Sequence, residues 1–303
     1  MRPQKPFYRF LLGAAIALAV IFIGFAWVGA LIPTWGSTQG EVSRALPGDE
    51  QVSAPDLVWN HALTINAPAE KVYPWLAQIG DSRAAFYSIT FIENAFCAMS
   101  GECVYRNASQ VNPEWQQPVK GQQGIIMDFL VIADYAPGQW VMATATDKMP
   151  LKWTWLWYVE PVNDITSRLI VRHRVDYPAD APKGMIDTVF TAGYVMERGM
   201  MLGIKARAEG STPGAWEEPL GAVLWLLVFA GGVVSAVRFV RKADGYHNLG
   251  LGLEAIVVLF VLTYIQPPMW ARMILMLMVA AGIAVTLWRP RVRSMLGMKP
   301  VVS

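Results

Sequence analysis

One histidine is the first candidate for acid–base chemistry. His173 lies in residues 166–177, which alternate as a strand, and it falls on the apolar face of that strand. An imidazole can act as a general base near neutral pH, although a single buried histidine is more often a hydrogen-bonded core residue. Tyr87 and Glu93 are the candidate acid–base partners. Acid–base catalysis is therefore one hypothesis.

The sequence offers little other catalytic chemistry. It contains no Ser-His-Asp order, nucleophile elbow or metal-ligand cluster, and Cys97 and Cys103 lack the second Cys or His pair of a structural zinc site. We expect no metal and no cofactor. The two cysteines are predicted to form a disulfide, because the membrane topology inferred below places them where disulfides persist.

Aromatic and methionine faces indicate a different kind of site. Residues 152–160 (KWTWLWYVE) place every second side chain, a tryptophan in three cases, on one face of a strand. Residues 184–209 form a long amphipathic helix with a methionine-rich stripe. Such faces fill a core or line a cavity for a hydrophobic ligand. The predicted ligand-binding residues are Tyr87, Phe129, Trp153, Trp155, Trp157, His173, Met196 and Met200.

The elements that must position these residues form one segment, 57–210. A strand at 57–67 is followed by two helices, a run of strands between 124 and 177, and the long helix. This order predicts an α+β fold in which a curved antiparallel sheet grips the C-terminal helix. Residues 34–56, rich in Gly, Ser and Pro, are predicted to be a linker.

Long apolar stretches lie on both sides of that segment. Residues 10–32 carry no charge and are long enough to cross a bilayer, and so are residues 219–240, 249–265 and 269–288. Pro267 and Pro268 predict a tight reversal between the last two. The predicted domains are a transmembrane helix at 1–33, the linker at 34–56, the α+β domain at 57–210, and a three-helix transmembrane region with a tail at 211–303.

Basic clusters predict how these four spans are oriented. Lys and Arg residues precede the first span and follow the second and the fourth, and the positive-inside rule places such clusters in the cytoplasm. Both termini are then cytoplasmic and the α+β domain lies outside the inner (plasma) membrane. Glu254 and Arg272 fall within spans, where snorkelling to the interface is the simpler interpretation and an ion pathway the alternative. A net charge of +2 with only 16% charged residues argues against nucleic acid as a partner.

Several motifs in shared order carry a family resemblance. They are residues 62–88 (ALTINAPAEKVYPWLAQIGDSRAAFYS), 91–94 (FIEN), 112–116 (NPEWQ), 153–161 (WTWLWYVEP), 166–174 (TSRLIVRHR) and 194–209 (YVMERGMMLGIKARAE). On these residues the chain resembles the SRPBCC, START-like superfamily of helix-grip domains, more closely its polyketide cyclase/dehydrase and lipid-transport group. Residues 97–109 depart from the family pattern.

The resemblance implies a binder of lipids or other hydrophobic small molecules, here tethered to the bilayer. It also singles out polar and aromatic motif residues with structural roles: Asp81, Arg83, Glu93, Glu114, Trp115, Glu197 and Arg198. The expected partners are therefore a lipid or hydrophobic molecule and the bilayer. The two alternatives are an enzyme of the cyclase or dehydrase type that uses His173 with Tyr87 or Glu93 as its acid–base pair, and a non-binding membrane scaffold.

Overall fold

Two units make up the chain, Met1–Val28 with Gly214–Ser303, and Gly29–Pro213. The structure is a computed structural model that describes residues 6–81, 83–100, 105–121, 124–241 and 245–295. The predicted disulfide between Cys97 and Cys103 lies outside the described residues, because Cys103 and the side chain of Cys97 are not among them.

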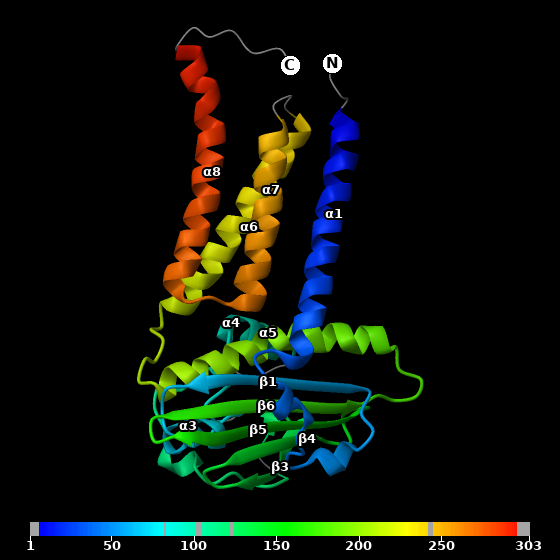
Figure 1. Cartoon of the computed structure of the whole chain (residues 1–303), viewed down its shortest axis with the longest axis vertical. Coiled ribbons are helices and arrows are strands. Elements are labelled where there is room, and N and C mark those ends of the chain that lie inside the picture. Colours follow the sequence, from blue (N-terminus) through cyan, green and yellow to red (C-terminus); the bar gives the residue numbers. More distant parts are fainter. Residues whose placement is uncertain (1–5, 82, 101–104, 122–123, 242–244, 296–303) are drawn as a thin grey trace. The chain divides into compact units, whose positions relative to one another are not determined.

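A six-stranded antiparallel sheet organises the unit of residues 29–213. Its strands are β1 (Leu57–Ile65), β2 (Gly124–Ile126), β3 (Leu130–Ala136), β4 (Trp140–Ala145), β5 (Lys152–Asn163) and β6 (Thr166–Asp176), in the spatial order β1-β6-β5-β4-β3-β2. The helices of the unit are α2 (Gln39–Ser43), α3 (Ala69–Ala77), α4 (Thr90–Ser100) and α5 (Lys183–Ala208), with short 3-10 turns η1 (Ile32–Thr34), η2 (Asp49–Val52) and η3 (Pro113–Trp115). The long α5 runs across one face of the sheet (Figure 1). The predicted α+β helix-grip architecture is confirmed.

The core of this unit lies between α5 and the alternate residues of β1, β5 and β6 that face it. Trp155 and Trp157 of β5 pack in one cluster with Met200, Met201 and Ile204 of α5. All five side chains are buried, so they fill the space between the tryptophan strand and the helix. The tryptophan and methionine faces therefore build core here, as side chains of this size commonly do.

One glycine lets α5 approach the rest of the domain closely. A Cβ atom added at Gly203 would lie 2.1 Å from the carbonyl oxygen of Tyr87, a distance that no side chain tolerates. Tyr87 itself has a positive φ of 59°. The Tyr87 ring lies 4.7 Å below the guanidinium of Arg207, one turn further along the helix. These contacts fix where the C-terminal half of α5 crosses the sheet.

The segment predicted as a linker, residues 34–56, packs on the other face of the sheet. Thr38 and Glu41 form a capping box at the start of α2, and Leu46 joins a small cluster with Leu156 and Ile170. Arginines of β6 that point away from α5 hold this segment on the sheet. Arg168 binds both carboxylate oxygens of Glu41, and Arg172 binds Asp49 and the carbonyl oxygen of Glu41.

Glu41 carries the electrostatic signature of that packing. Burial would raise the pKa of its carboxyl, but hydrogen bonds and charge attraction from Arg168, together with bonds from Thr38, outweigh burial and lower the pKa to about 2. The carboxylate is therefore ionised throughout the physiological range. Composition predicted a linker. In the structure the segment is ordered, because it supplies the acceptors that Arg168 and Arg172 on the sheet require.

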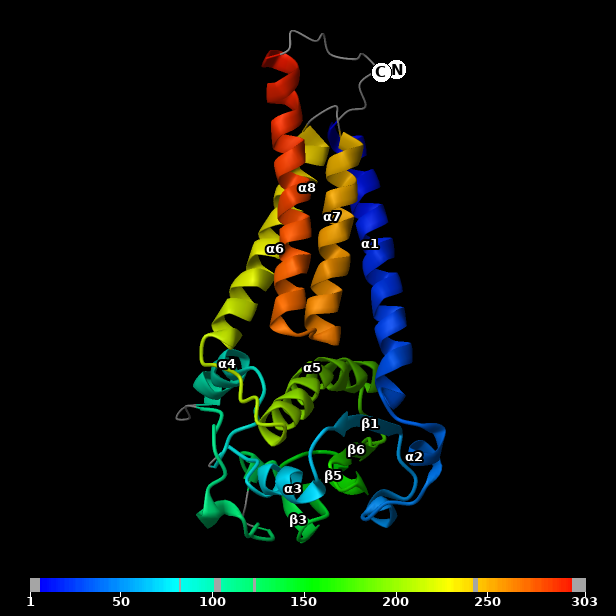
Figure 2. The same cartoon turned by 60° about the vertical axis from the view of Figure 1, so that its left-hand side comes forward.

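Four long apolar helices form the other unit: α1 (Pro6–Leu31), α6 (Glu217–Arg241), α7 (Gly245–Phe260) and α8 (Met269–Met295). They run alongside one another in both views (Figures 1 and 2). Each is long and apolar enough to cross a membrane, as predicted, and a π-helical turn, η4 (Val261–Ile265), extends α7. At the predicted reversal before α8, the Arg272 Nε donates to the carbonyl oxygen of Pro267 at 2.7 Å. Arg272 thus closes the turn.

Candidate functional site

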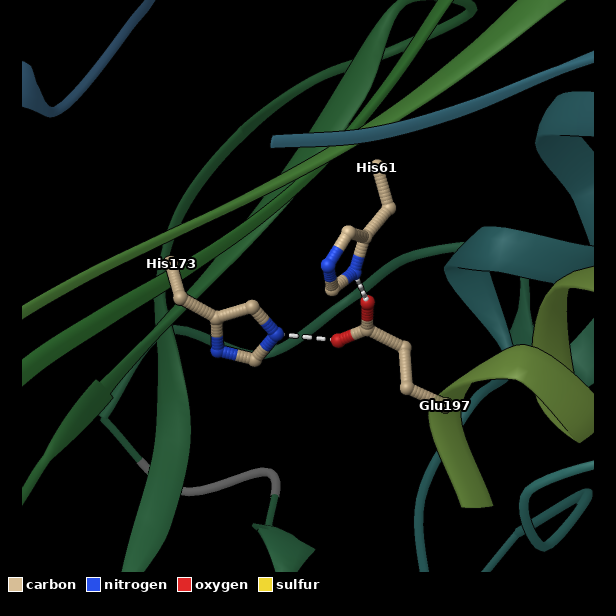
Figure 3. Close-up of side chains that lie close together, drawn as sticks. All are labelled: His61, His173 and Glu197. Atoms are coloured by element: carbon tan, nitrogen blue, oxygen red, sulfur yellow. Dashed lines mark hydrogen bonds and ion pairs between the residues drawn. The ribbon is translucent and has the colours of Figure 1, made fainter. Parts of the chain in front are cut away.

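Three buried side chains from three elements meet between the sheet and α5. His61 of β1, His173 of β6 and Glu197 of α5 are 0%, 4% and 4% exposed, and we call them the His–Glu cluster. β1 and β6 pair antiparallel with Trp59 opposite His173, so His61 and His173 are diagonal neighbours on one face. The Glu197 side chain extends from α5 toward both imidazole rings, and each of its carboxylate oxygens contacts one of them (Figure 3).

The carboxylate of Glu197 uses both of its oxygens. Oε1 contacts Nδ1 of His61, and Oε2 contacts Nε2 of His173. Oε2 also accepts a hydrogen bond of 3.0 Å from the indole N–H of Trp155. An acidic residue that is this deeply buried is stable only when its lone pairs are matched by donors.

The outer nitrogens of the two rings fix where their protons lie. Trp153 donates its indole N–H to Nδ1 of His173 at 2.9 Å, and an indole nitrogen can only donate. His173 therefore carries its proton on Nε2 and donates to Glu197. The Nε2 of His61 lies 2.7 Å from the carbonyl oxygen of Ile32, which can only accept, so this nitrogen carries a proton as well.

One further proton is needed between His61 and Glu197. A neutral His61 with its proton on Nε2 would turn the lone pair of Nδ1 toward Oε1, and two acceptors would face each other. Burial raises the pKa of the Glu197 carboxyl, but the charges and hydrogen bonds of His173 and His61 outweigh it and hold that pKa well below its ordinary value. The two facing atoms, Nδ1 of His61 and Oε1 of Glu197, therefore share one proton.

The same hydrogen-bond donors and acceptors show whether the His–Glu cluster could hold a metal ion. One ligand atom from each residue lies within 4.8 Å of the others, which is compatible with a shared ion. A ligating histidine donates its second N–H to an acceptor, and His61 does so toward Ile32. His173 does not fit, because its second nitrogen accepts from Trp153 and a metal on Nε2 would require a ring with no proton. The hydrogen bonds around the two histidines therefore favour a proton, rather than a metal ion, between the rings and Glu197.

Aromatic rings enclose the His–Glu cluster. The ring of His173 stacks on Trp153 and Trp155 at 5.6 and 5.3 Å, and Trp59 and Tyr194 lie edge-on or tilted to His61 at 5.6 and 5.2 Å. These rings exclude water and strengthen the electrostatic interactions inside. Beside them, the Arg198 guanidinium lies 4.0 Å from the ring centroid of Trp35.

A pocket of about 520 Å³ adjoins the His–Glu cluster at one end of the sheet. It lies between the loop that joins β4 to β5, the end of β6 and η2, and Trp153 forms part of its wall. Apolar lining comes from Val52, Met149, Leu151 and Pro178. The polar lining residues are Gln51, Thr144, Thr146, Asp147, Lys152, Thr154 and Asp176. Trp153 is thus the residue that the pocket wall shares with the surroundings of the His–Glu cluster, because its indole N–H donates to His173.

The predicted ligand-binding residues occupy different places. Trp153 and His173 belong to the pocket wall and the His–Glu cluster, and Trp155 lies directly behind them. Trp157 and Met200 are buried in the core, while Met196 is half-buried and its carbonyl oxygen accepts from Ser88. Tyr87 donates to the carbonyl oxygen of Trp75, and Phe129 is half-buried in the turn between β2 and β3.

The acid–base hypothesis gave His173 the wrong neighbours. The carboxylate beside it belongs to Glu197, whereas Tyr87 lies near Gly203 and Arg207, about 9–15 Å further along α5 at helical rise. Glu93 is buried on α4. Neither Tyr87 nor Glu93 appears among the contacts of His173.

The remaining motif residues have structural surroundings. Arg83 donates to the carbonyl oxygen of Trp115, which packs against the core, and Glu114 is exposed in η3. Asp81 lies in the turn that leads to Arg83. Sequence reasoning missed His61 as a site residue and gave Glu197 only a structural role. The alternation of β1 places His61 on its apolar face, but the pairing with β6 is not readable from either strand alone.

Comparison with known proteins concerns the fold. No family model matches the sequence, and no curated protein matches it. Among solved structures, the di-domain ARO/CYC BexL matches at 16% identity with a TM-score of 0.32, covering 50% of this chain and 46% of that one, so the match spans about half of BexL.

Two further matches cover nearly whole proteins. A START superfamily protein from Mycobacterium smegmatis matches at 11% identity and a TM-score of 0.30, over 51% of this chain and 99% of that one. An aromatase/cyclase from a Streptomyces species matches at 14% and 0.27, over 50% and 93%. At these identities and TM-scores the similarity does not extend to function. By its strand order and its gripped C-terminal helix, the unit of residues 29–213 contains a START-like helix-grip domain.

Proposed function

We propose that the START-like domain binds an amphipathic lipid or other hydrophobic small molecule in the pocket beside Trp153. The observation that carries this proposal is the double role of Trp153, which walls the pocket and donates its N–H to the buried His–Glu cluster. Ligand sites are concave, of about 300–1,000 Å³, and combine apolar walls with a few fixed polar groups. The pocket of about 520 Å³ falls within that range of volumes, and polar groups make up a larger share of its wall than apolar ones.

The lining specifies an amphipathic ligand. Met149, Leu151 and Pro178 offer apolar surface on one part of the wall, and Lys152 and Asp176 offer opposite charges on another. Core side chains fill the space between β5 and α5, so the ligand is proposed to occupy the pocket at the end of the sheet.

The His–Glu cluster has a role in this proposal as the support of the pocket wall. A buried ion pair is weak support for stability, because desolvation offsets much of its attraction. It fixes position instead. Trp153 is held by a hydrogen bond to His173 and by stacking on the same ring, and His173 is held by Glu197. A wall that is ordered before binding loses less entropy when the ligand arrives.

The enzyme hypothesis has weaker support. A general base needs a free lone pair within hydrogen-bond reach of its substrate. The Nδ1 lone pair of His173 accepts from Trp153, and its Nε2 proton is donated to Glu197. Both ring nitrogens are thus occupied within the protein, which favours binding over acid–base catalysis by this residue.

Extraction of co-purified molecules tests the proposal. Met149→Trp would fill the pocket from its loop, and Ile165→Trp is the matched control, because Ile165 is 73% exposed in the β5–β6 turn and is absent from the pocket wall. Mass spectrometry of organic extracts should detect an amphipathic molecule with the wild-type full-length protein and with Ile165→Trp, and much less with Met149→Trp. Equal amounts from all three proteins would contradict the proposal.

We also propose that the four long apolar helices cross the inner membrane and hold this domain on its outer side. Support comes from their length and composition and from the basic clusters in alternate loops. A tether of this kind raises the effective concentration of membrane lipid near the pocket. A membrane-impermeant maleimide should label Ile165→Cys on intact cells when Cys97 and Cys103 are serine. Labelling only after permeabilisation would contradict this orientation.

A further inference from the structure

An apolar site lies within the membrane unit, independent of the pocket in the START-like domain. It is a groove of about 570 Å³ bounded by α1, α6 and α7. Its lining includes Ala17 of α1, Ala236 and Phe239 of α6, and Asn248 and Gly252 of α7. Nearly all of its lining residues are apolar, and the chemistry of its few polar groups distinguishes it from general lipid-facing surface.

The groove exists because α1 contacts the other helices at two separated levels. A Cβ at Gly13 would lie 2.9 Å from the Phe239 ring, and one at Gly24 would lie 2.7 Å from the Phe260 ring. Phe25 and Phe260 also pack edge-to-face at 5.2 Å. Between these two contacts, Ala14 and Ala17 of α1 and Gly232, Ala236 and Gly252 of α6 and α7 carry little or no side chain, which leaves space between the helices.

One end of the groove carries an unsatisfied polar group. Asn248 is 4% exposed in the first turn of α7, and its Oδ1 has no hydrogen-bond partner among the described residues. A buried amide oxygen without a donor is energetically unfavourable. By contrast, Thr263 near the other end accepts from the Trp225 indole at 3.0 Å. The free acceptor on Asn248 indicates that a donor belongs beside it.

The size of the groove indicates what brings that donor. A helix of 16 residues with a diameter of about 10 Å occupies roughly 1,900 Å³, so it could insert only some of its side chains into a groove of about 570 Å³. A single hydrocarbon chain fits within it. The groove extends from Asn248 to Thr263, about 20 Å along α7 at helical rise.

We propose that this groove binds a single-chain lipid with a hydroxyl-bearing head, which lies at Asn248 while its chain follows the groove. A hydroxyl both donates and accepts, so it satisfies the carbonyl half of the amide and can also accept from its N–H. Asn248 lies close to the end of α7, where the head of a lipid in the adjoining leaflet would lie.

Native mass spectrometry of the full-length protein with two oleoyl lipids tests this site. Monoolein carries free hydroxyls, and methyl oleate has the same chain without a donor. The wild-type protein should retain monoolein more strongly, and Asn248→Leu should remove that preference through a roughly two- to tenfold loss in monoolein affinity. Equal retention of the two lipids by the wild-type protein would overturn the proposed contact.

A matched pair of variants on α6 tests the groove itself. Ala236→Phe would fill it, whereas Val237→Phe places the same ring at the next position, which is exposed and does not line the groove. Ala236→Phe should lose monoolein and Val237→Phe should keep it. Equal binding by both variants, or cross-linking of another polypeptide from position 17, would overturn the proposal. If Ala236→Phe does not fold, the two-lipid comparison on the wild-type protein decides.

Discussion

Replacing Glu197 with glutamine tests where the protons of the His–Glu cluster lie. Glutamine has the same length and offers one carbonyl oxygen and one NH₂ group. Its oxygen would accept from Nε2 of His173 and from Trp155, and its NH₂ would donate to Nδ1 of a neutral His61. Every group is then satisfied without the extra proton. Replacing a buried ion pair with satisfied neutral partners is often neutral or stabilising, so the expected change at pH 7 is within about 1 kcal/mol.

Glu197→Ala is the contrasting variant. It removes the acceptor of His173 and Trp155 and leaves Nδ1 of His61 buried without its partner. Breaking a buried pair by removing one partner costs about 3–5 kcal/mol. In a unit of 150–250 residues, about 1 kcal/mol shifts the melting temperature by about 2–4 °C, so the expected loss is roughly 6–20 °C.

Thermal unfolding of the full-length protein in detergent, followed by tryptophan fluorescence, separates the two variants. Trp153 and Trp155 contact the His–Glu cluster, so their emission reports on its loss. Glutamine should unfold close to the wild-type temperature and alanine far below it. If glutamine lowers the melting temperature as much as alanine does, the protons do not lie where the hydrogen bonds place them.

Three further predictions concern acid, helix packing and metal. The pKa of Glu41 is lowered from 4.5 to about 2, and that of Glu197 is lowered as well, so the stability that they contribute is complete above about pH 5 and is lost as pH falls toward 2. Melting temperatures should therefore decline from pH 7 to pH 3, and Glu41→Gln should flatten the decline. A flat profile of the wild-type protein would contradict this. Gly203→Ala should destabilise the protein by about 1–3 kcal/mol in denaturant titrations, because the added Cβ would meet the Tyr87 carbonyl oxygen. Gly193→Ala on the same helix, where an added Cβ would have no atom within 4 Å, should be neutral or stabilising. Equal effects of the two substitutions would argue against the close approach. Neither a chelator nor added Zn²⁺ should change the melting temperature, and a rise of several degrees with Zn²⁺ would show that the His–Glu cluster holds a metal.

The sequence allowed the membrane helices and the gripped helix to be predicted, because both depend on local patterns. An uncharged stretch such as residues 10–32 needs no knowledge of tertiary structure, and neither do the periods of β5, β6 and α5. The role of residues 34–56 was not predictable in this way. Their composition is that of a linker, and only the positions of Arg168 and Arg172 on the sheet explain why they are ordered.

The site was predictable only in part for a similar reason. His173 could be placed on an inward face from alternation alone, but its partner depends on which turn of α5 crosses β6. That crossing is set by the contact of Gly203 with Tyr87, far from His173 in sequence. The register of β1 on β6, which brings in His61, is likewise a tertiary property.

Photocrosslinking from the pocket wall tests the central claim most directly. A benzophenone side chain in place of Met149 would project into the pocket beside Trp153, and the same group in place of Ile165 would face solvent. After illumination in membranes, intact-mass spectrometry should find a small amphipathic adduct on the protein labelled at position 149 and none on the protein labelled at position 165. The absence of an adduct at position 149, or equal adducts at both positions, would contradict ligand binding at this pocket.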